Sequence, residues 1–143
     1  MKKILRGYLA HPVLAREKVA IFEKNFERRT GIDLVNPFTE VEREPEENLA
    51  ASEQGCYDNC DKIVDLDLAA IMSCDFLVAF VTGQRSYGTI MEICYAYSMG
   101  KPVFIICENG HEKHPWLVYH SDKIFTNTKD FRKYIQDYND ASL

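Results

Sequence analysis

Short apolar runs alternate along the chain with longer segments whose apolar residues recur at helical spacing. The apolar runs have the length of strands, and they cover Ile4–Ala10, Ile32–Val35, Phe76–Val81 and Val103–Cys107, with a weaker one at Lys123–Thr126. The segments between them predict helices over Val13–Arg29, Ile63–Cys74, Thr89–Met99 and Lys129–Tyr138. Gly100 and Pro102 directly after the third of these helices form a clear stop signal.

Strands that alternate with helices indicate a parallel sheet covered by helices on both faces. The runs Phe76–Val81 and Val103–Cys107 are apolar throughout, as expected of central strands buried on both faces. We therefore expect a single α/β domain over residues 1–143, a three-layer sandwich around a central parallel sheet of about five strands. Ligands of such sheets bind beyond the carboxyl ends of the strands, here the loops Ala10–Pro12, Asn36–Phe38 and Thr82–Gly88.

Charge and composition narrow the functional classes. The net charge of −5 argues against a protein that binds the phosphate backbone of a nucleic acid. No long apolar run occurs between Met1 and Arg16, so we expect no signal peptide, no membrane span and a cytoplasmic location. Cys56 and Cys60 have no matching Cys or His pair, and we expect no metal or other cofactor.

The segment Thr39–Asp61 has neither helical nor strand periodicity and is rich in acidic residues. A lid, an insertion that faces a partner and a solvated loop are all open, and we favour the solvated loop.

Glu92 is the first candidate for chemistry. It follows a loop that leaves a buried strand, and we expect it in the first turn of the next helix, where the helix dipole stabilises an anion. However, Thr89 to Glu92 also matches a capping box, in which Glu92 only binds the backbone N–H of Thr89. Local sequence alone favours the capping role.

Asp67 shares a helical face with Ile63 and Ile71, and a carboxylate in an apolar stripe needs a partner or a raised pKa. A hydrogen bond to a loop or a salt bridge is an equally good explanation, and Asp65 and Asp75 are rival candidates. Tyr8, in the first strand, is either a packed core aromatic or a functional hydroxyl.

Arg85 and Ser86 lie on the glycine-bounded loop before Glu92. A guanidinium, a hydroxyl and loop amides can hold a phosphate or a sugar hydroxyl, and an ordinary surface turn is the alternative.

These residues also stand in a recognisable order. Tyr8-Leu9-Ala10 comes first, and Asp67 to Asp75 leads into a buried strand; Ser86-Tyr87-Gly88-Thr89-Ile90-Met91-Glu92, Tyr95-Ala96 and Gly100-Lys101-Pro102-Val103 follow. From Lys3 to Phe131 the sequence resembles the nucleoside 2-deoxyribosyltransferase family, which includes relatives that hydrolyse deoxynucleoside monophosphates. We accordingly expect a flavodoxin-like fold, and a homo-oligomer whose active sites are shared between subunits.

The resemblance implies a role for three residues. Glu92 matches the nucleophile that attacks the anomeric carbon of deoxyribose, Asp67 the carboxyl that contacts the base and supplies its proton, and Tyr8 the tyrosine that holds the nucleophile. This agrees with the general chemistry of retention at an anomeric centre, which needs one carboxylate nucleophile and one carboxylic acid. With these roles the capping explanation for Glu92 becomes the weaker one.

The sequence departs from the family in two places. Transferases of the family have an aspartate six residues before the nucleophile, whereas this chain has Ser86, as the monophosphate hydrolases do. On the other hand, Ala10-His11-Pro12-Val13 lacks the Gly/Ser/Arg-rich phosphate loop of those hydrolases, and His11 replaces a glycine usual in both groups. Gly88 and Phe38 are further candidates for substrate contacts, and Ser121 or Asp122 falls where family members lend a residue to the neighbouring subunit's site.

We therefore expect an enzyme that cleaves the N-glycosidic bond of 2′-deoxynucleosides and transfers the sugar to another base. Hydrolysis of a 2′-deoxynucleoside 5′-monophosphate is the first alternative, and a nucleotide-binding protein without turnover is the second. The expected partners are a small deoxynucleoside or deoxynucleotide and a free base, with no nucleic acid polymer and no membrane.

Overall fold

The computed structural model describes residues 3–39 and 60–141 of the chain. It contains one sheet of five parallel strands in the order β2-β1-β3-β4-β5. The strands are β1 (Arg6–Ala10), β2 (Asp33–Val35), β3 (Phe76–Val81), β4 (Val103–Cys107) and β5 (Lys123–Phe125). The helices are η1 (Val13–Ala15), α1 (Arg16–Thr30), α3 (Cys60–Ser73), α4 (Tyr87–Ser98), α5 (Pro115–Tyr119) and α6 (Thr128–Ala141).

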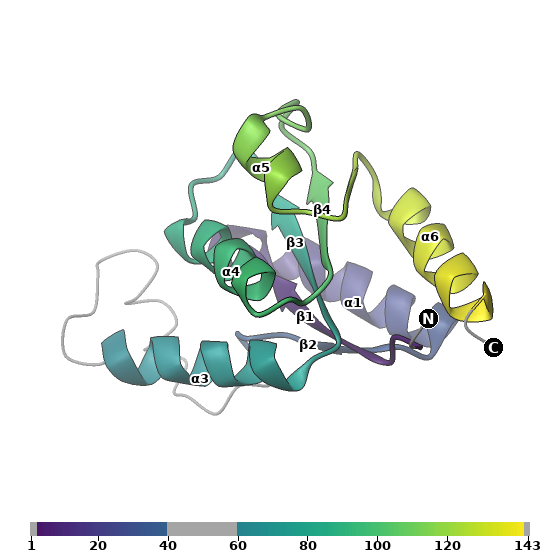
Figure 1. Ribbon diagram of the computed structural model, residues 1–143, viewed down its shortest axis with the longest axis horizontal. Coiled ribbons are helices and arrows are strands. Elements are labelled where there is room, and N and C mark those ends of the chain that lie inside the picture. Colours follow the sequence, from purple (N-terminus) through teal and green to yellow (C-terminus); the bar gives the residue numbers. More distant parts are fainter. Residues whose placement is uncertain (1–2, 40–59, 142–143) are drawn as a thin grey trace.

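The helices cover both faces of the sheet, which confirms the expected three-layer α/β architecture (Figure 1). Alternate residues of each strand point to opposite faces. Leu9, Val78 and Phe104 pack with Phe26 of α1 and Phe131 of α6. Tyr8, Ala10, Leu77 and Ile105 face the other way and pack with Ile71 of α3, Ile93 of α4 and Leu117 of α5.

The strand predictions agree closely with the structure. The bounds of β3 and β4 are as predicted, and β1, β2 and β5 lie inside the predicted runs. The stop signal after α4 is confirmed, because Met99 caps the helix and Gly100 takes a left-handed backbone with φ of 75°.

The helix predictions were less accurate, since α3 begins at Cys60 rather than Ile63 and α6 ends at Ala141 rather than Tyr138. The segment predicted as one helix from Val13 divides into the short helix η1 and the helix α1. The helix predicted to begin at Thr89 begins at Tyr87, because Ser86 caps it. The short helix α5 was not predicted at all. Its Pro115 at the first position and His114 as cap were the local signals for it.

The core has one position that only glycine can occupy. Gly7 in β1 lies beneath the ring of Phe76, and a Cβ at this position would stand 2.2 Å from the Cζ of that ring. The close approach lets β1 and β3 pair directly beneath the cluster of phenylalanines.

Two sequence expectations are limited by the part of the chain that is described. Most of the acidic segment Thr39–Asp61 lies outside the described residues. Among the helices of residues 3–39 and 60–141, none is long and apolar enough to cross a membrane.

Candidate active site

The candidate site lies at the carboxyl edge of the sheet, on the face covered by α3 and α4. Tyr8 points to this face from β1 and is completely buried, and its hydroxyl donates a hydrogen bond to Oε2 of Glu92 on α4. A tyrosine that packs in the core and also binds a carboxylate combines the two roles considered for Tyr8. The contact joins residues that are 84 positions apart in the sequence.

A cavity of about 340 Å³ opens next to this contact, between α3 and α4. Its lining includes both candidate carboxyl groups, Asp67 of α3 and Glu92 of α4, together with Gly88. The remaining wall is Cys60, Ile63, Val64, Leu68, Met91 and Tyr95. The structure therefore brings together three of the predicted site residues around one cavity, with Tyr8 behind them.

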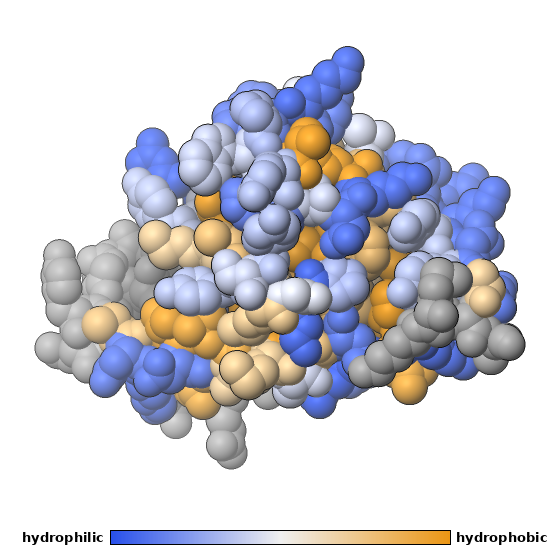
Figure 2. Space-filling view, in the orientation of Figure 1, coloured by the Kyte–Doolittle hydropathy of each residue, from blue (hydrophilic) through white to orange (hydrophobic). Residues whose placement is uncertain are grey.

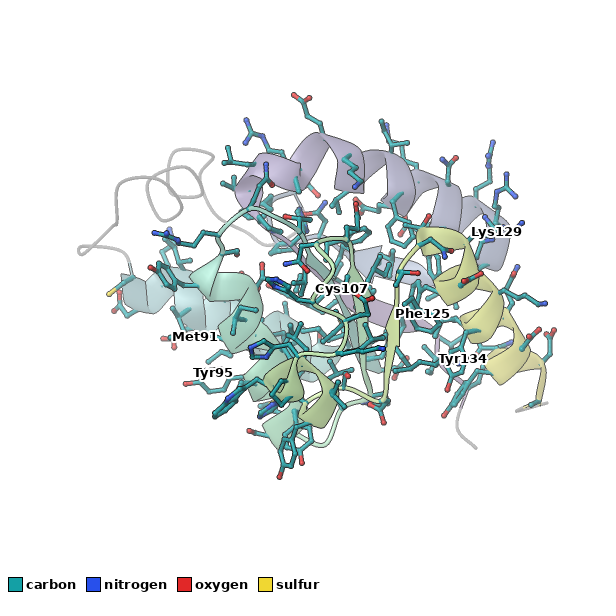
Figure 3. The ribbon with its side chains drawn as sticks, turned by 90° about the horizontal axis from the view of Figure 1, so that it is seen from above. Met91, Tyr95, Cys107, Phe125, Lys129 and Tyr134 are labelled. Carbon is teal, nitrogen blue, oxygen red and sulfur yellow. The ribbon has the colours of Figure 1, made fainter. Side chains whose placement is uncertain are left out.

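The wall of the cavity is mostly apolar. Figure 2 shows hydrophobic surface between α3 and α4, the two helices that line the cavity. Figure 3 shows that Met91 and Tyr95 lie on α4, far from Tyr134 and Lys129 of α6. An apolar wall with a few polar groups is typical of a site for a flat organic molecule such as a base.

Met91 and Tyr95 were not predicted as site residues. Both are largely exposed, and in sequence they are only apolar residues on an amphipathic helix. One signal could have found them. Met91 and Tyr95 are four positions apart and so share a helix face, and Tyr95 is three positions after Glu92, which places that face beside the carboxylate.

The capping explanation for Glu92 was wrong. The helix cap is Ser86, whose hydroxyl accepts a hydrogen bond from the backbone N–H of Thr89 at 3.2 Å. Thr89 is therefore inside α4 rather than at its start, and Glu92 lies in the second turn. Glu92 therefore does not form the expected capping box with Thr89. It also lies farther from the helix N-terminus than expected, so the dipole stabilises its charge less.

Ser86 itself is engaged in the structure. Besides the backbone of Thr89, its Oγ lies 2.7 Å from the hydroxyl of Thr89. Arg85, next to it, is exposed to solvent. Gly88, two residues after Ser86, is part of the cavity wall. Ser86 therefore shapes the loop, and a contact of Ser86 or Arg85 with substrate stays a prediction.

His11 and Phe38 lie together at the carboxyl ends of β1 and β2. The two rings meet edge to face, with 4.9 Å between their centroids and an interplanar angle of 74°. His11 is only 3% exposed, and its Nδ1 lies 3.0 Å from the carbonyl oxygen of Leu9. Burial lowers the pKa of His11 to about 4, although the hydrogen bond to Leu9 acts in the opposite direction. The imidazole is therefore neutral near pH 7.

Ser121 and Asp122 do not lie near the cavity of their own chain. The Asp122 carboxylate accepts a hydrogen bond of 2.7 Å from the backbone N–H of Val103, at the amino end of β4. The Ser121 hydroxyl donates to the carbonyl of Leu117 in α5. Their predicted role at a neighbouring subunit's site stays a prediction.

Asp75, a rival of Asp67 in the sequence, also lies at the amino edge. Its carboxylate accepts hydrogen bonds from the backbone N–H groups of Leu5 and Arg6, at 3.0 and 3.1 Å. This structural role removes Asp75 from the candidates for chemistry. Asp65 is exposed on α3 and does not line the cavity.

The described residues offer no ready metal site, since no group of three or more His, Cys, Asp and Glu side chains is placed to hold an ion there. What they offer is a pair of carboxyl groups facing one apolar cavity, one of them fixed by a tyrosine hydroxyl. Such a pair can supply a nucleophile and a proton donor on either side of a bond to be broken.

A family model described as nucleoside 2-deoxyribosyltransferase matches residues 8–136 of the sequence. The chain belongs to this family. The match includes Tyr8, Asp67 and Glu92, and it confirms the resemblance on which the sequence interpretation rests. The family is one of enzymes that transfer or cleave at the N-glycosidic bond.

Solved structures share the fold at low identity. A 2-deoxyribosyltransferase from Bacillus psychrosaccharolyticus superimposes with a TM-score of 0.70 at 21% identity, over 90% of this chain and 91% of that chain. A CMP N-glycosidase from Clostridium botulinum gives 0.57 at 24% identity, over 93% and 99%. A 2-desoxiribosyltransferase from Leishmania mexicana gives 0.63 at 16% identity, over 92% and 97%. No curated protein matches the sequence significantly.

Proposed function

We propose that the protein is a nucleoside 2-deoxyribosyltransferase that cleaves the N-glycosidic bond of a 2′-deoxynucleoside through a covalent deoxyribosyl–Glu92 intermediate. The observation that carries the proposal is the Glu92 carboxylate, held by the hydroxyl of Tyr8 in a cavity that Asp67 also lines. Membership of the family supports the reaction class.

The first half of the reaction makes the intermediate. A carboxylate oxygen of Glu92 attacks C1′ of the sugar, and the bond from C1′ to the base nitrogen breaks with its electron pair going to the base. Asp67, across the cavity, supplies the proton that the departing base needs. The apolar side chains beside it, Ile63, Val64 and Leu68, suit the flat face of that base.

In the second half a new base takes the place of the first. Its ring nitrogen attacks C1′, its proton returns to Asp67, and Glu92 leaves as a carboxylate. If water attacks instead, the same intermediate gives the free sugar. Tyr8 stabilises the charge of the Glu92 carboxylate when it is not bonded to the sugar. The same hydrogen bond fixes the direction from which the carboxylate attacks.

Hydrolysis of a 2′-deoxynucleoside 5′-monophosphate is the second candidate. Ser86 in place of an aspartate favours it, since a carboxylate there would repel a phosphate, and exposed Arg85 beside it adds a positive charge. The similar fold of a CMP N-glycosidase is compatible with it. We rank it below transfer because Ala10-His11-Pro12 offers no glycine-rich loop for a phosphate and because His11 is neutral.

One assay separates the two candidates. The protein is incubated with a 2′-deoxynucleoside and a second free base, and then with the matching 5′-monophosphate alone. Formation of the exchanged nucleoside without any phosphate supports transfer. Release of free base only from the monophosphate would overturn it in favour of hydrolysis.

A protein that binds nucleotides without turnover is the third candidate, and Glu92→Gln tests it. In an enzyme the substitution removes the nucleophile, so base release should fall by a factor on the order of a thousand or more while binding persists. Glu17→Gln, at an exposed glutamate of α1, is the matched control and should keep full activity. If the unaltered protein releases no base from any deoxynucleoside or deoxynucleotide, the enzyme proposal fails.

We also propose that the protein acts as a homo-oligomer with shared sites. Large side chains are exposed on α4 and α5: Tyr87, Met91, Tyr95, Trp116, Val118 and Tyr119. The two helices are in contact through the rings of Tyr97 and Tyr119. Exposed apolar and aromatic surface of this kind is typical of a surface that another subunit covers. Light scattering should therefore give a mass above the 16.5 kDa of one chain.

A further inference from the structure

Among the described residues, a buried ring nitrogen at the carboxyl edge makes no hydrogen bond. Nε2 of His11 is buried from solvent and makes no hydrogen bond within residues 3–39 and 60–141. The other ring nitrogen, Nδ1, lies 3.0 Å from the carbonyl oxygen of Leu9. A carbonyl oxygen can only accept, so Nδ1 carries the proton, and in the neutral ring Nε2 is then a bare lone pair.

An acceptor of this kind is costly to leave unpaired. Nearly all buried polar groups in proteins have a hydrogen-bond partner, and one without a partner destabilises the fold. A group that breaks this rule needs a specific explanation, and a functional role is one of them.

The position of His11 indicates which ligand could supply the missing donor. His11 directly follows the last residue of β1, and Tyr8 two residues before that end binds Glu92. Ligands of parallel α/β sheets bind beyond the carboxyl ends of the strands, and His11 is at this end. The neighbouring Asn36 follows β2 and donates to Glu23 at 3.0 Å, and it makes no hydrogen bond with Nε2 of His11.

We propose that Nε2 of His11 accepts a hydrogen bond from a neutral O–H or N–H group of the substrate, and that this contact makes His11 a specificity residue against a phosphate at the same place. The inference rests on the proposed function, because it assigns a recognition contact within the same site. It adds a chemical requirement on the substrate, which must present a donor rather than an anion to this end of β1.

The discrimination follows from the lone pair. A phosphate monoester loses its second proton with a pKa of about 6, so near pH 7 it presents mainly acceptor oxygens. These oxygens and the lone pair of Nε2 repel each other. Protonation of the imidazole would remove the repulsion, but burial opposes it by lowering the pKa of His11. A sugar hydroxyl or an amino group of the base has a proton to give.

Phe38 is the ring next to His11, and it is only partly buried. Neither ring is part of the described lining of the cavity between α3 and α4. A substrate group that binds Nε2 therefore extends beyond that cavity, and Phe38 lies beside the contact.

The test uses two substitutions of His11 in the full chain. His11→Phe keeps a flat ring that can pack against Phe38, but it removes the acceptor. His11→Gln keeps an acceptor, because its amide reaches about as far as Nε2. We expect His11→Phe to lower kcat/KM for 2′-deoxynucleosides about tenfold, mainly through a higher KM, and His11→Gln to restore part of it.

Substrate analogues identify the donor and separate recognition from a general structural effect. The probes are 2′,3′-dideoxy and 2′,5′-dideoxy analogues of deoxyadenosine, and deoxyinosine in place of deoxyadenosine for the amino group of the base. For the analogue that lacks the donor, kcat/KM of the unaltered protein should fall by about the same factor as His11→Phe causes with the complete substrate. With that analogue, His11→Phe should then lower kcat/KM no further.

Three results would overturn the inference. His11→Phe lowering kcat/KM equally for every analogue would mean that His11 is structural only. A kcat/KM unchanged by the substitution would mean that nothing binds Nε2. A preference of the unaltered protein for 5′-monophosphates that His11→Phe leaves in place would refute the discrimination. All three presuppose activity, so an inactive unaltered protein refutes the proposed function instead.

Discussion

At the amino edge of the sheet, Asp122 and Asn139 bind main-chain groups, whereas at the carboxyl edge Tyr8 and Glu92 bind each other. Asn139 is typical of the first edge, since its amide donates to the carbonyl of Ile4 at 2.7 Å and accepts from the N–H of Ile4 at 2.8 Å. A side chain bound in this way ties together two ends of the chain and closes the fold.

The carboxyl edge uses the same kinds of side chain differently. Its polar groups pair with one another or face a cavity, and the Nε2 atom of His11 has no partner within the described residues. The comparison teaches that residue type alone does not separate structural from functional carboxylates. A structural carboxylate accepts hydrogen bonds from backbone N–H groups, whereas a functional one faces a cavity or another side chain.

Apart from replacing the nucleophile Glu92, the largest effect is expected at Asp67. Asp67→Asn keeps the shape of the side chain but removes a proton donor, so base release should fall by a factor on the order of a thousand, within the usual range for general acid catalysis. Steady-state assays with a deoxynucleoside measure this.

Asp65→Asn is the matched control for Asp67, because it makes the same change on the same helix at an exposed position. It should leave activity within about twofold of the unaltered protein, as surface changes usually do. Equal losses in both variants would show that the charge of α3 matters and not the carboxyl group in the cavity.

At the amino edge, Asn139→Leu should destabilise the protein without touching catalysis. The substitution leaves the buried N–H and C=O groups of Ile4 without partners, and together these should cost about 3 kcal/mol of unfolding free energy. Urea denaturation measures the loss. Activity per folded molecule should stay unchanged at low temperature, and a fall in kcat there would contradict the separation of the two edges.

The sequence predicted the strands more accurately than the starts of the helices. The strands β3 and β4 were located correctly because residues buried on both faces form an uninterrupted apolar run. Helix starts are less certain, and the error at α4 came from two hydroxyl residues three positions apart, Ser86 and Thr89, either of which can cap.

The partners of the polar residues were beyond the reach of local patterns. That Asp122 binds the N–H of Val103, and that Phe38 packs on His11, depends on segments brought together only by the fold. The match of Glu92 with Tyr8 was the exception, because the family resemblance supplied a contact across 84 positions that no local rule contains.

The next prediction concerns pH and comes from His11. Burial lowers its folded pKa to about 4 from 6.5, so the unfolded chain binds a proton more readily between these values. Stability from this group is therefore fully present above about pH 6.5 and is lost as the pH falls towards 4, with a loss on the order of 2 kcal/mol between pH 7 and pH 5.

The measurement is urea denaturation at several pH values for the unaltered protein and for His11→Phe. The variant has no group to protonate at this position and should show a flatter dependence. An equally steep decline in both proteins would assign the acid sensitivity to other groups.

The smallest effect is expected at Tyr8. Tyr8→Phe keeps the buried ring, which is completely enclosed in the core, and removes only the hydroxyl that binds Glu92. The Glu92 carboxylate still lines the cavity, so the variant should remain active with kcat lower by about tenfold, equivalent to about 1.4 kcal/mol in the barrier. The pH at which activity declines on the acid side should also rise, because a carboxylate that loses a hydrogen-bond donor becomes easier to protonate. A pH profile of kcat for Tyr8→Phe measures both changes, and a variant whose profile coincides with that of the unaltered protein would place Tyr8 among the purely structural residues, together with Asn139.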